Sequence, residues 1–338
     1  MTGPEVLCAS CGAALPAPHD DTTEVRCGAG HPTPVVAGII DCRPPLAGFD
    51  AGADRRRALD LAAREDASFE DLLRRYWATH PDVAPELAAR FTRGDLIGAD
   101  RATEVVDQIE AEAGRPADPA TVVLEVGCGT AALGAALAHR TSWVVASDVS
   151  LAWLVLARRR IRSLGIDNVT LVAAPADRLP FRDGTFGLVV AADVIEHVPD
   201  VDGMVRSCAR VLRTGGTMWV STPNRYSLTP EPHVRLWGVG FLPRSVALRY
   251  VRRFRGVDYH DVRTLSAWRL RRALQAGGAR VRVDVPPIAG AVRATYGPVA
   301  RRAIDGYHLA RRVPVARQAL LLVAPLFHGT LHKDRDAA

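Results

Sequence analysis

The stretch VLEVGCGTAALG, residues 123–134, decides the fold. A short apolar run leads into Glu125, and Gly127 and Gly129 then bracket Cys128. At the end of a buried strand, two glycines let the backbone turn tightly and approach a ligand. A helix that starts directly after the turn would add its N-terminal amides. The stretch therefore predicts a strand, a ligand-binding turn and a helix.

Two common nucleotide-binding turns do not fit this stretch. The dinucleotide pattern needs a third glycine where Ala132 stands, and a phosphate-binding loop needs a Gly-Lys-Ser or Gly-Lys-Thr sequence, which this turn lacks. Many α/β proteins carry glycine turns for packing only, so the turn alone does not identify a ligand. The identity of the ligand depends on the strands that follow.

From Thr121 onward, short β-branched runs alternate with helical patterns. Helices are expected over Leu151–Leu164 and Asp202–Leu212. Alternating strands and helices imply a parallel sheet with helices on both faces. The expected strands are residues 121–126, 142–148, 169–174, 186–194, 217–223, 279–285 and 319–327.

Polar residues follow successive strands in a fixed order. SDVS places Asp148 where it would hold a ribose diol, DVIEHV ends the fourth strand, and STPNRYSL ends the fifth. This series resembles the class I S-adenosylmethionine-dependent methyltransferases. The resemblance implies an α/β, Rossmann-like fold with a seven-stranded sheet and helices on both faces. Its last strand, ALLLVAPLFHGTLHK (residues 319–333), would be antiparallel.

The resemblance also implies a site for S-adenosyl-L-methionine as cofactor. Ala131 replaces the third glycine of the family's turn, and Pro175 stands where an adenine-binding aspartate is common. The implied cofactor contacts are Glu125, Gly127, Cys128 and Gly129 for the methionine part, Asp148 for the ribose, Val149, Ala176 and Asp177 for the adenine, and Asp193 beside the methyl group.

The sequence DVIEHV supplies the catalytic candidates Asp193, Glu196 and His197. Their spacing lets all three side chains face one way if a helical turn follows the strand. Two carboxylates and an imidazole suit a divalent cation, and the ubiquinone-pathway O-methyltransferases, which the pattern resembles, associate this group with Mg²⁺. Two alternatives remain: Glu196 and His197 pack at the start of a helix without a metal, or His197 acts as a general base.

Four of the six cysteines lie in the first 42 residues. Cys8 and Cys11 form one metal-binding knuckle, and Cys27 with His31 forms a second, a ligand set that suits tetrahedral zinc. Cys42 is the alternative fourth ligand. The segment resembles the zinc ribbons fused to bacterial rRNA guanine methyltransferases, and it predicts a structural Zn²⁺.

These patterns divide the 338-residue chain into three parts. Residues 1–46 are expected to form the zinc-ribbon-like segment, and residues 47–118 a helical lid or linker. Residues 119–338 would form the methyltransferase domain, with a substrate-capping insertion at 223–261. The Pro/Gly-rich sequence GRPADPA, residues 114–120, marks a boundary.

Composition adds expectations about location and partners. No secretory signal precedes Cys8, and the longest apolar stretch, Ala319–Phe327, is too short to span a bilayer, so a cytoplasmic protein with reduced thiols is expected. The formal charge of +6 is carried almost entirely by arginine and is a weak sign of an anionic partner. Residues 307–322, YHLARRVPVARQALLL, would touch a membrane surface peripherally or form a core helix with snorkelling arginines. The sequence does not indicate the oligomeric state.

The favoured acceptor is a small molecule methylated on a hydroxyl, in specialised (natural-product) or lipid- or quinone-like metabolism. Aromatic and histidine side chains are expected to wall its pocket. These are Tyr76, Trp77, His233, Trp237, Tyr259 and His260.

Two other classes of function were weighed. An RNA methyltransferase is supported by the zinc ribbon and the basic charge. However, the chain lacks an Asn-Pro-Pro-Tyr motif at its fourth strand and an obvious platform for base stacking. A scaffold that binds cofactor without catalysis is disfavoured by the intact turn and Asp148.

Overall fold

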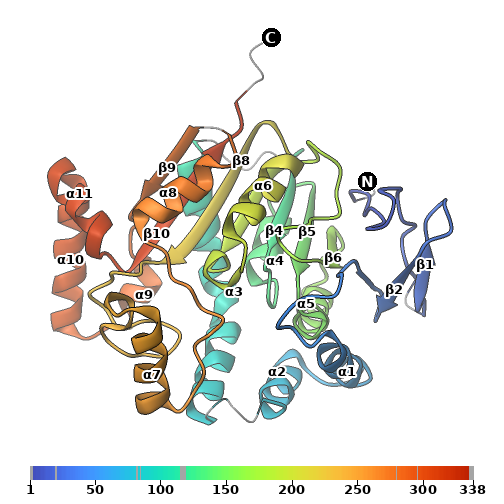
Figure 1. Ribbon diagram of the computed structural model, residues 1–338, viewed down its shortest axis with the longest axis horizontal. Coiled ribbons are helices and arrows are strands. Elements are labelled where there is room, and N and C mark those ends of the chain that lie inside the picture. The colour runs from blue at the N-terminus through green and yellow to red at the C-terminus, as the bar shows by residue number, and fades with distance from the viewer. Residues whose placement is uncertain are drawn as a thin grey trace.

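The computed structural model describes residues 3–19, 21–80, 83, 85–114, 119–278, 280–294 and 296–334 (Figure 1). Most of the boundary segment expected at 114–120 lies outside these residues.

One sheet runs through the described part of the chain, in the order β1-β2-β3-β6-β5-β4-β7-β8-β10-β9. Its last seven strands have the expected class I arrangement, with β10 antiparallel to β8 and β9, so the predicted fold class is confirmed. The strands are β1 Glu24–Arg26, β2 Pro32–Val36, β3 Ile39–Asp41, β4 Val122–Val126, β5 Trp143–Asp148, β6 Val169–Ala173, β7 Phe186–Ala192, β8 Leu212–Pro223, β9 Arg280–Asp284 and β10 Leu326–His332.

Helices cover both faces of this sheet. Successive strand side chains point to opposite faces, and Val189 and Val190 of β7 accordingly belong to two different core clusters. Helices α3, α4 and α5 pack on one face, with α1 and α2 outside α5, while α6 and α8 pack on the other. These helices are α1 Ala51–Ala62, α2 Phe69–Ala78, α3 Pro85–Ala113, α4 Ala132–Ala138, α5 Leu151–Ser163, α6 Val201–Val211 and α8 Ala267–Gln275.

The N-terminal segment extends the central sheet. Strand β3 pairs in parallel with β6, with Ile40 opposite Val172, and β2 pairs with β3 with Val35 opposite Ile40. All three side chains belong to one buried cluster. The segment expected as a zinc ribbon therefore lies at the edge of the central sheet (Figure 1) and shares its core.

The expected last strand is shorter than the sequence indicated. Only Leu326–His332 forms β10, whereas Ala319–Val323 belongs to α11, Pro314–Val323. A short apolar run does not by itself distinguish a strand from a helix, and Pro314 favours a helix because its fixed φ suits the first helical turn.

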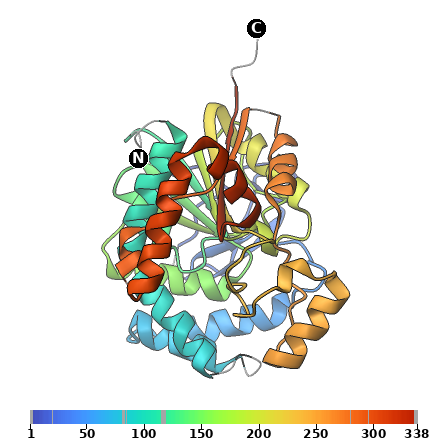
Figure 2. The same cartoon turned by 90° about the vertical axis from the view of Figure 1, so that its left-hand side faces the viewer.

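Helix α11 and its partner α10, Pro298–Arg312, form a hairpin on the outside of the molecule, after the short α9, Gly290–Ala294 (Figure 2). No residue of α11 is buried, and Val299, Val315 and Leu322 are largely exposed. Residues 307–322 are therefore divided between two surface helices, and Tyr307, Leu320 and Leu321 pack against the core from outside. Among the described helices, none has the length and apolar character needed to cross a membrane.

The segment after β8 builds a small lobe around α7, Arg244–Arg255. This lobe lies beyond the strand ends, at the lower left in Figure 1. It has an apolar core of its own, made of Val234, Val239, Ala247, Val251, Tyr259 and Val262.

Candidate active site

The turn after β4 has the left-handed backbone that its glycines permit. Gly127 has φ +67°, and a Cβ there would meet the Val194 side chain at 2.4 Å. Gly129 has φ +50° and open space where a side chain would stand. Ala131, at the place of the family's third glycine, keeps φ +51°, although this conformation costs an alanine about 1–2 kcal/mol. The backbone therefore keeps the shape of a glycine turn, although an alanine stands at the third glycine position.

A cleft of about 930 Å³ opens above this turn. It lies beyond the carboxyl ends of β4, β5 and β7, where ligands bind in doubly wound sheets. The described residues that line it are Trp77, Arg90, Phe91, Arg93, Gly94, Asp95, Ile97, Arg101, Gly127, Gly129, Thr130, Asp148, Trp153, Asp193, Val194 and His197.

Asp148 lies at the end of β5 with its carboxylate fixed by backbone amides. Oδ2 accepts a hydrogen bond from the amide of Gly129 at 2.9 Å, and Oδ1 accepts one from Ser150 at 2.8 Å. Burial raises the pKa of this carboxyl, although these two amides oppose the shift. A carboxylate has about four acceptor sites, and the Val149 amide also bonds to this one, so the group keeps an acceptor site for a ligand hydroxyl in the cleft.

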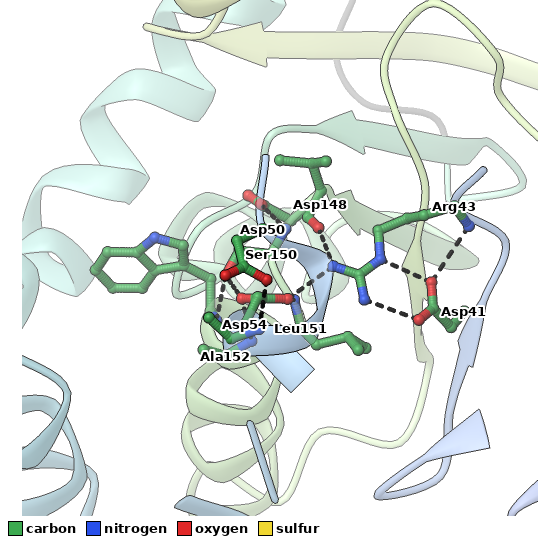
Figure 3. Close-up of polar contacts among 11 residues, drawn as sticks. Asp41, Arg43, Asp50, Asp54, Asp148, Ser150, Leu151 and Ala152 are labelled. Carbon is green, nitrogen blue, oxygen red and sulfur yellow. Dashed lines mark hydrogen bonds and ion pairs between the residues drawn. The ribbon is translucent and has the colours of Figure 1, made fainter. Parts of the chain in front are cut away.

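The loop that carries Asp148 is held by Asp54 of α1 (Figure 3). Asp54 is 4% exposed and accepts hydrogen bonds from the Ser150 hydroxyl at 2.6 Å and from the amides of Leu151 at 2.8 Å and Ala152 at 3.3 Å. These amides belong to the first turn of α5, whose N-terminus favours a negative charge. A side chain from a distant helix thus caps the helix that follows the cofactor loop.

Arg43 neutralises Asp54 and ties it to the N-terminal segment (Figure 3). Its guanidinium donates to Asp54 at 2.7 Å, to the Val149 carbonyl at 2.8 Å, and to both oxygens of Asp41 at the end of β3. The Arg43 side chain is 2% exposed. Neither Arg43 nor Asp54 was singled out from the sequence, because no motif marks them.

Glu125 is a buried carboxyl inside β4. Burial raises its pKa to about 8, and the nearby Asp148 charge adds to the shift. Its Oε2 atom has no hydrogen-bond partner among the described residues. An unsatisfied acceptor beside the turn is consistent with a ligand group that completes the site.

Three of the expected cofactor contacts lie outside the described lining of the cleft. Val149, Ala176 and Asp177 are half-buried and do not belong to the described lining of the cleft, so their contacts stay predictions. Cys128 is buried, and burial raises the pKa of its thiol, which suits a packing role.

The acidic–histidine group differs from the expected arrangement. Asp193 has φ +54° and turns its carboxylate toward the Ser221 hydroxyl, from which it accepts a hydrogen bond at 2.9 Å. Glu196 and His197 instead meet His233, and the possible ligand atoms of these three residues lie within 4.8 Å of one another. The Mg²⁺ set Asp193, Glu196 and His197 is therefore not assembled, because the left-handed Asp193 breaks the helical spacing on which it depended.

Charges within this group shift its pKa values in opposite directions. Burial and the negative charge of Asp193 raise the pKa of Glu196 to about 7. Partial desolvation of its ring, although the residue as a whole is exposed, and the adjacent His233 lower the pKa of His197. The pKa of His233 is raised in spite of burial, because its ring bonds to Glu231.

The aromatic residues of α2 differ in their role. Trp77 lines the cleft with Phe91 of α3 and Trp153 of α5. Tyr76 is buried behind them, with its ring centroid 4.4 Å from that of Trp153. The sequence pointed to Trp77 but missed Phe91 and Trp153, because their helices come together only in the fold.

Three acceptor residues expected in the insertion are absent from the described lining of the cleft. Tyr259 is buried in the core of the lobe. Trp237 is 61% exposed and donates to the Leu228 carbonyl. His260 is exposed and offers only its carbonyl, to Arg244. None of the three lines the described cleft, because the lobe folds around its own core, so their contact with an acceptor stays a prediction.

The four expected zinc ligands converge at the N-terminus. The Cys11 and Cys27 sulfurs are 3.6 Å apart, as are Cys27 Sγ and His31 Nδ1, and Cys8 completes a group whose ligand atoms lie within 4.8 Å of one another. Backbone hydrogen bonds, opposed by desolvation, lower the pKa of Cys8 to about 7. Cys42 is buried elsewhere, and burial raises its pKa to about 12, so it does not belong to the group.

Comparisons with known proteins agree with this geometry. Residues 124–220 match a family profile described as a methyltransferase domain. Over 157 residues, the chain is 33% identical to the ubiquinone biosynthesis O-methyltransferase of Xanthomonas campestris pv. campestris, which covers 46% of this chain and 59% of that protein. Over 101 residues, it is 41% identical to methyltransferase GfsG of Streptomyces halstedii, which covers 29% and 36% respectively.

Among solved structures, an S-adenosylmethionine-dependent methyltransferase from Mesorhizobium loti aligns with a TM-score of 0.46 at 20% identity, over 67% of this chain and 97% of that one. The chain spans about three fifths of the length of the ubiquinone-pathway relative. The resemblance to class I methyltransferases, and to those of the ubiquinone pathway, is confirmed for the matched residues.

Replacing Asp54 with alanine should lower the free energy of unfolding by about 3–5 kcal/mol, because buried Arg43 would lose one of its two carboxylate partners and the Ser150 hydroxyl and Leu151 amide would lose their acceptor. Asp60 on the same helix is a matched control, since its ion pairs with Arg64 and Arg75 are exposed and its removal should cost at most about 1 kcal/mol. Denaturant titration of both variants measures the difference. Equal losses would contradict the role given to Asp54.

Replacing Glu125 with glutamine should stabilise the protein without cofactor at neutral pH. The folded state raises the pKa of this carboxyl from 4.5 to about 8, so ionisation of the unfolded chain reduces stability as the pH rises between these values. Glutamine cannot ionise, and the gain should be roughly 1–3 kcal/mol at pH 7 and vanish near pH 4. Denaturant titrations at both pH values, with Glu86→Gln as an exposed control, would test this, and a gain independent of pH would refute it.

Proposed function

We propose that this chain, whose residues 124–220 match a methyltransferase domain, transfers a methyl group from S-adenosyl-L-methionine to a hydroxyl of a small molecule. One observation carries the proposal: Asp148 and His197 line the same cleft. A residue suited to the cofactor's ribose and a residue suited to the acceptor's proton therefore face one cavity. Relatives named as O-methyltransferases of ubiquinone biosynthesis support an acceptor in quinone-like or specialised metabolism.

The residues around the turn fit the cofactor. Gly129 leaves open space beside the cleft, Asp148 has free acceptor sites, and Glu125 has an unpaired oxygen. When bound, the cofactor supplies an activated methyl group on a sulfonium. Gly127 and Gly129 would hold its methionine part and Asp148 its ribose.

The other lining residues would position the acceptor. Trp77, Phe91 and Trp153 give the cleft an aromatic wall that excludes water and binds an apolar ring. Asp193 and His197 stand at the opposite side of the turn. His197, with Glu196 beside it, would assist loss of the proton that a hydroxyl releases as it is methylated, either by taking it up or by holding a cation that makes the hydroxyl more acidic. Alignment of the two substrates supplies much of the remaining rate enhancement.

We further propose a structural zinc ion at Cys8, Cys11, Cys27 and His31. Two sulfurs bound to zinc at about 2.3 Å in a tetrahedron lie roughly 3.7 Å apart, close to the 3.6 Å between Cys11 and Cys27. The ion would stiffen the segment that carries β1 to β3 and leads into Arg43.

Calorimetry with S-adenosylhomocysteine tests the cofactor assignment. The wild-type chain should bind it, and Asp148→Asn should bind roughly 5- to 150-fold more weakly, since each mispaired hydrogen bond costs about 1–3 kcal/mol. Asp183→Asn, an exposed ion-pair variant, should bind normally. Absence of binding by the wild-type chain would overturn the proposal.

The acceptor is identified by transfer of a labelled methyl group to a panel of phenols, sugars, polyketides and RNA. We expect label on the hydroxyl of a small molecule. Label in RNA alone would favour an RNA methyltransferase instead.

Elemental analysis tests the zinc site. The double variant Cys8→Ser/Cys11→Ser should lose one equivalent of zinc, and Cys42→Ser should retain it, because Cys42 lies outside the group. Full zinc in the double variant would refute the site. If Cys42→Ser lost the ion and His31→Ala kept it, only the fourth ligand would be wrong.

A further inference from the structure

We infer that Glu196, His197 and His233 form a binding site for a divalent first-row transition-metal ion at the edge of the cleft. Only the role of the ion rests on the proposed function: we expect it to assist the proposed methyl transfer. Two of the residues come from the turn after β7, and His233 comes from the lobe after β8. Their possible ligand atoms lie within 4.8 Å of one another.

The spacing of the two imidazoles fits a shared ion. His197 Nε2 and His233 Nε2 are 3.2 Å apart. Two nitrogens that each bind zinc at about 2.0–2.1 Å in a tetrahedron lie roughly 3.3 Å apart. His233 Nε2 is also 4.0 Å from Glu196 Oε1, which completes a two-histidine, one-carboxylate set.

In each ring, the nitrogen that does not face the shared site bonds to another protein group, as in most metal-binding histidines. His233 Nδ1 lies 2.6 Å from a carboxylate oxygen of Glu231. The His197 ring hydrogen-bonds to the backbone of Asp261, and we assign this bond to Nδ1 because Nε2 faces His233. When both Nδ1 atoms carry the ring hydrogens of neutral imidazoles, the two Nε2 lone pairs face each other. A cation between or beside the two nitrogens would stabilise these tautomers.

The surroundings of Glu196 distinguish a proton shared by the two imidazoles from a bound metal ion. Its Oε2 atom accepts a hydrogen bond from the Thr222 hydroxyl at 2.9 Å, while Oε1 is buried without a partner among the described residues. The residue is only 1% exposed. A proton shared by the two imidazoles would leave Oε1 unsatisfied, and buried polar groups seldom remain so. A divalent ion would satisfy all three side chains.

The donor set also selects the kind of ion. Imidazole nitrogens suit zinc, iron, cobalt and nickel, whereas Mg²⁺ prefers carboxylate, carbonyl and water oxygens. Asp193, which would have supplied a second carboxylate, is directed to Ser221. His197 is exposed and lines the cleft, so a bound ion would keep a position open toward the acceptor. An ion there would make a hydroxyl of the acceptor more acidic.

Metal content of the purified full chain, compared with that of single variants, tests the inference. Zinc-loaded wild type should hold two equivalents, one in the cysteine group and one here. His233→Ala should hold one, while His260→Ala, an exposed histidine of the same lobe outside the group, should hold two. Glu231→Gln should weaken the second zinc by about 10- to 100-fold in calorimetric titration. Mg²⁺ in large excess should not displace that zinc.

Unchanged metal content in both His233→Ala and His197→Ala would overturn the inference and leave a shared proton as the explanation. Binding of S-adenosylhomocysteine and the unfolding midpoint of each variant show whether it has folded. The two proposals fail separately. Methyl transfer that depends on His197 without a second metal would refute the metal site alone, and a second metal without transfer to any acceptor would refute the proposed function alone.

Discussion

The buried contact between Arg43 and Asp54 is the interaction on which the rest of the site depends. One carboxylate caps α5, binds the hydroxyl of Ser150 and pairs with a guanidinium that also holds the carbonyl of Val149. A buried ion pair adds little stability compared with apolar side chains of the same size. We therefore interpret its main effect as geometric: it fixes the loop on which Asp148 is presented.

Strand pairing and this contact together join the N-terminal segment to the central sheet. Strand β3 pairs with β6 beside the cofactor loop, and Asp41 at its end holds Arg43 from the other side. A zinc ion in the cysteine group would reduce the freedom of the loops between β1 and the start of the chain. The segment would then act on the cofactor site through a continuous sheet and one bridging arginine.

Several residues of the site lower the stability of the fold. Ala131 and Asp193 adopt left-handed backbone conformations, and Glu125 and Glu196 are buried carboxyls that each have one oxygen without a partner in the described part of the chain. Such strain is found where a binding site is shaped in advance for its ligand. The cost is offset by the apolar clusters on both faces of the sheet.

The sequence by itself determined the elements and motifs that depend on neighbouring residues. The apolar runs of β4 to β8, the turn at Gly127 and Gly129, the place of Asp148, and the Cys8, Cys11, Cys27 and His31 set all follow from local spacing, and the fold has them where they were expected. Local spacing failed for residues 319–323, where an apolar run fits a helix as well as a strand.

Only the tertiary structure decided which distant side chains meet. Arg43 and Val149 are 106 residues apart, Asp54 and Ser150 are 96 apart, and His197 and His233 are 36 apart. Sequence periodicity reports which face of an element is buried, but not which loop ends adjoin at the edge of a sheet. The left-handed turn at Asp193 shows the same limit, because local spacing did not indicate that its carboxylate bonds to Ser221 while His233 joins Glu196 and His197.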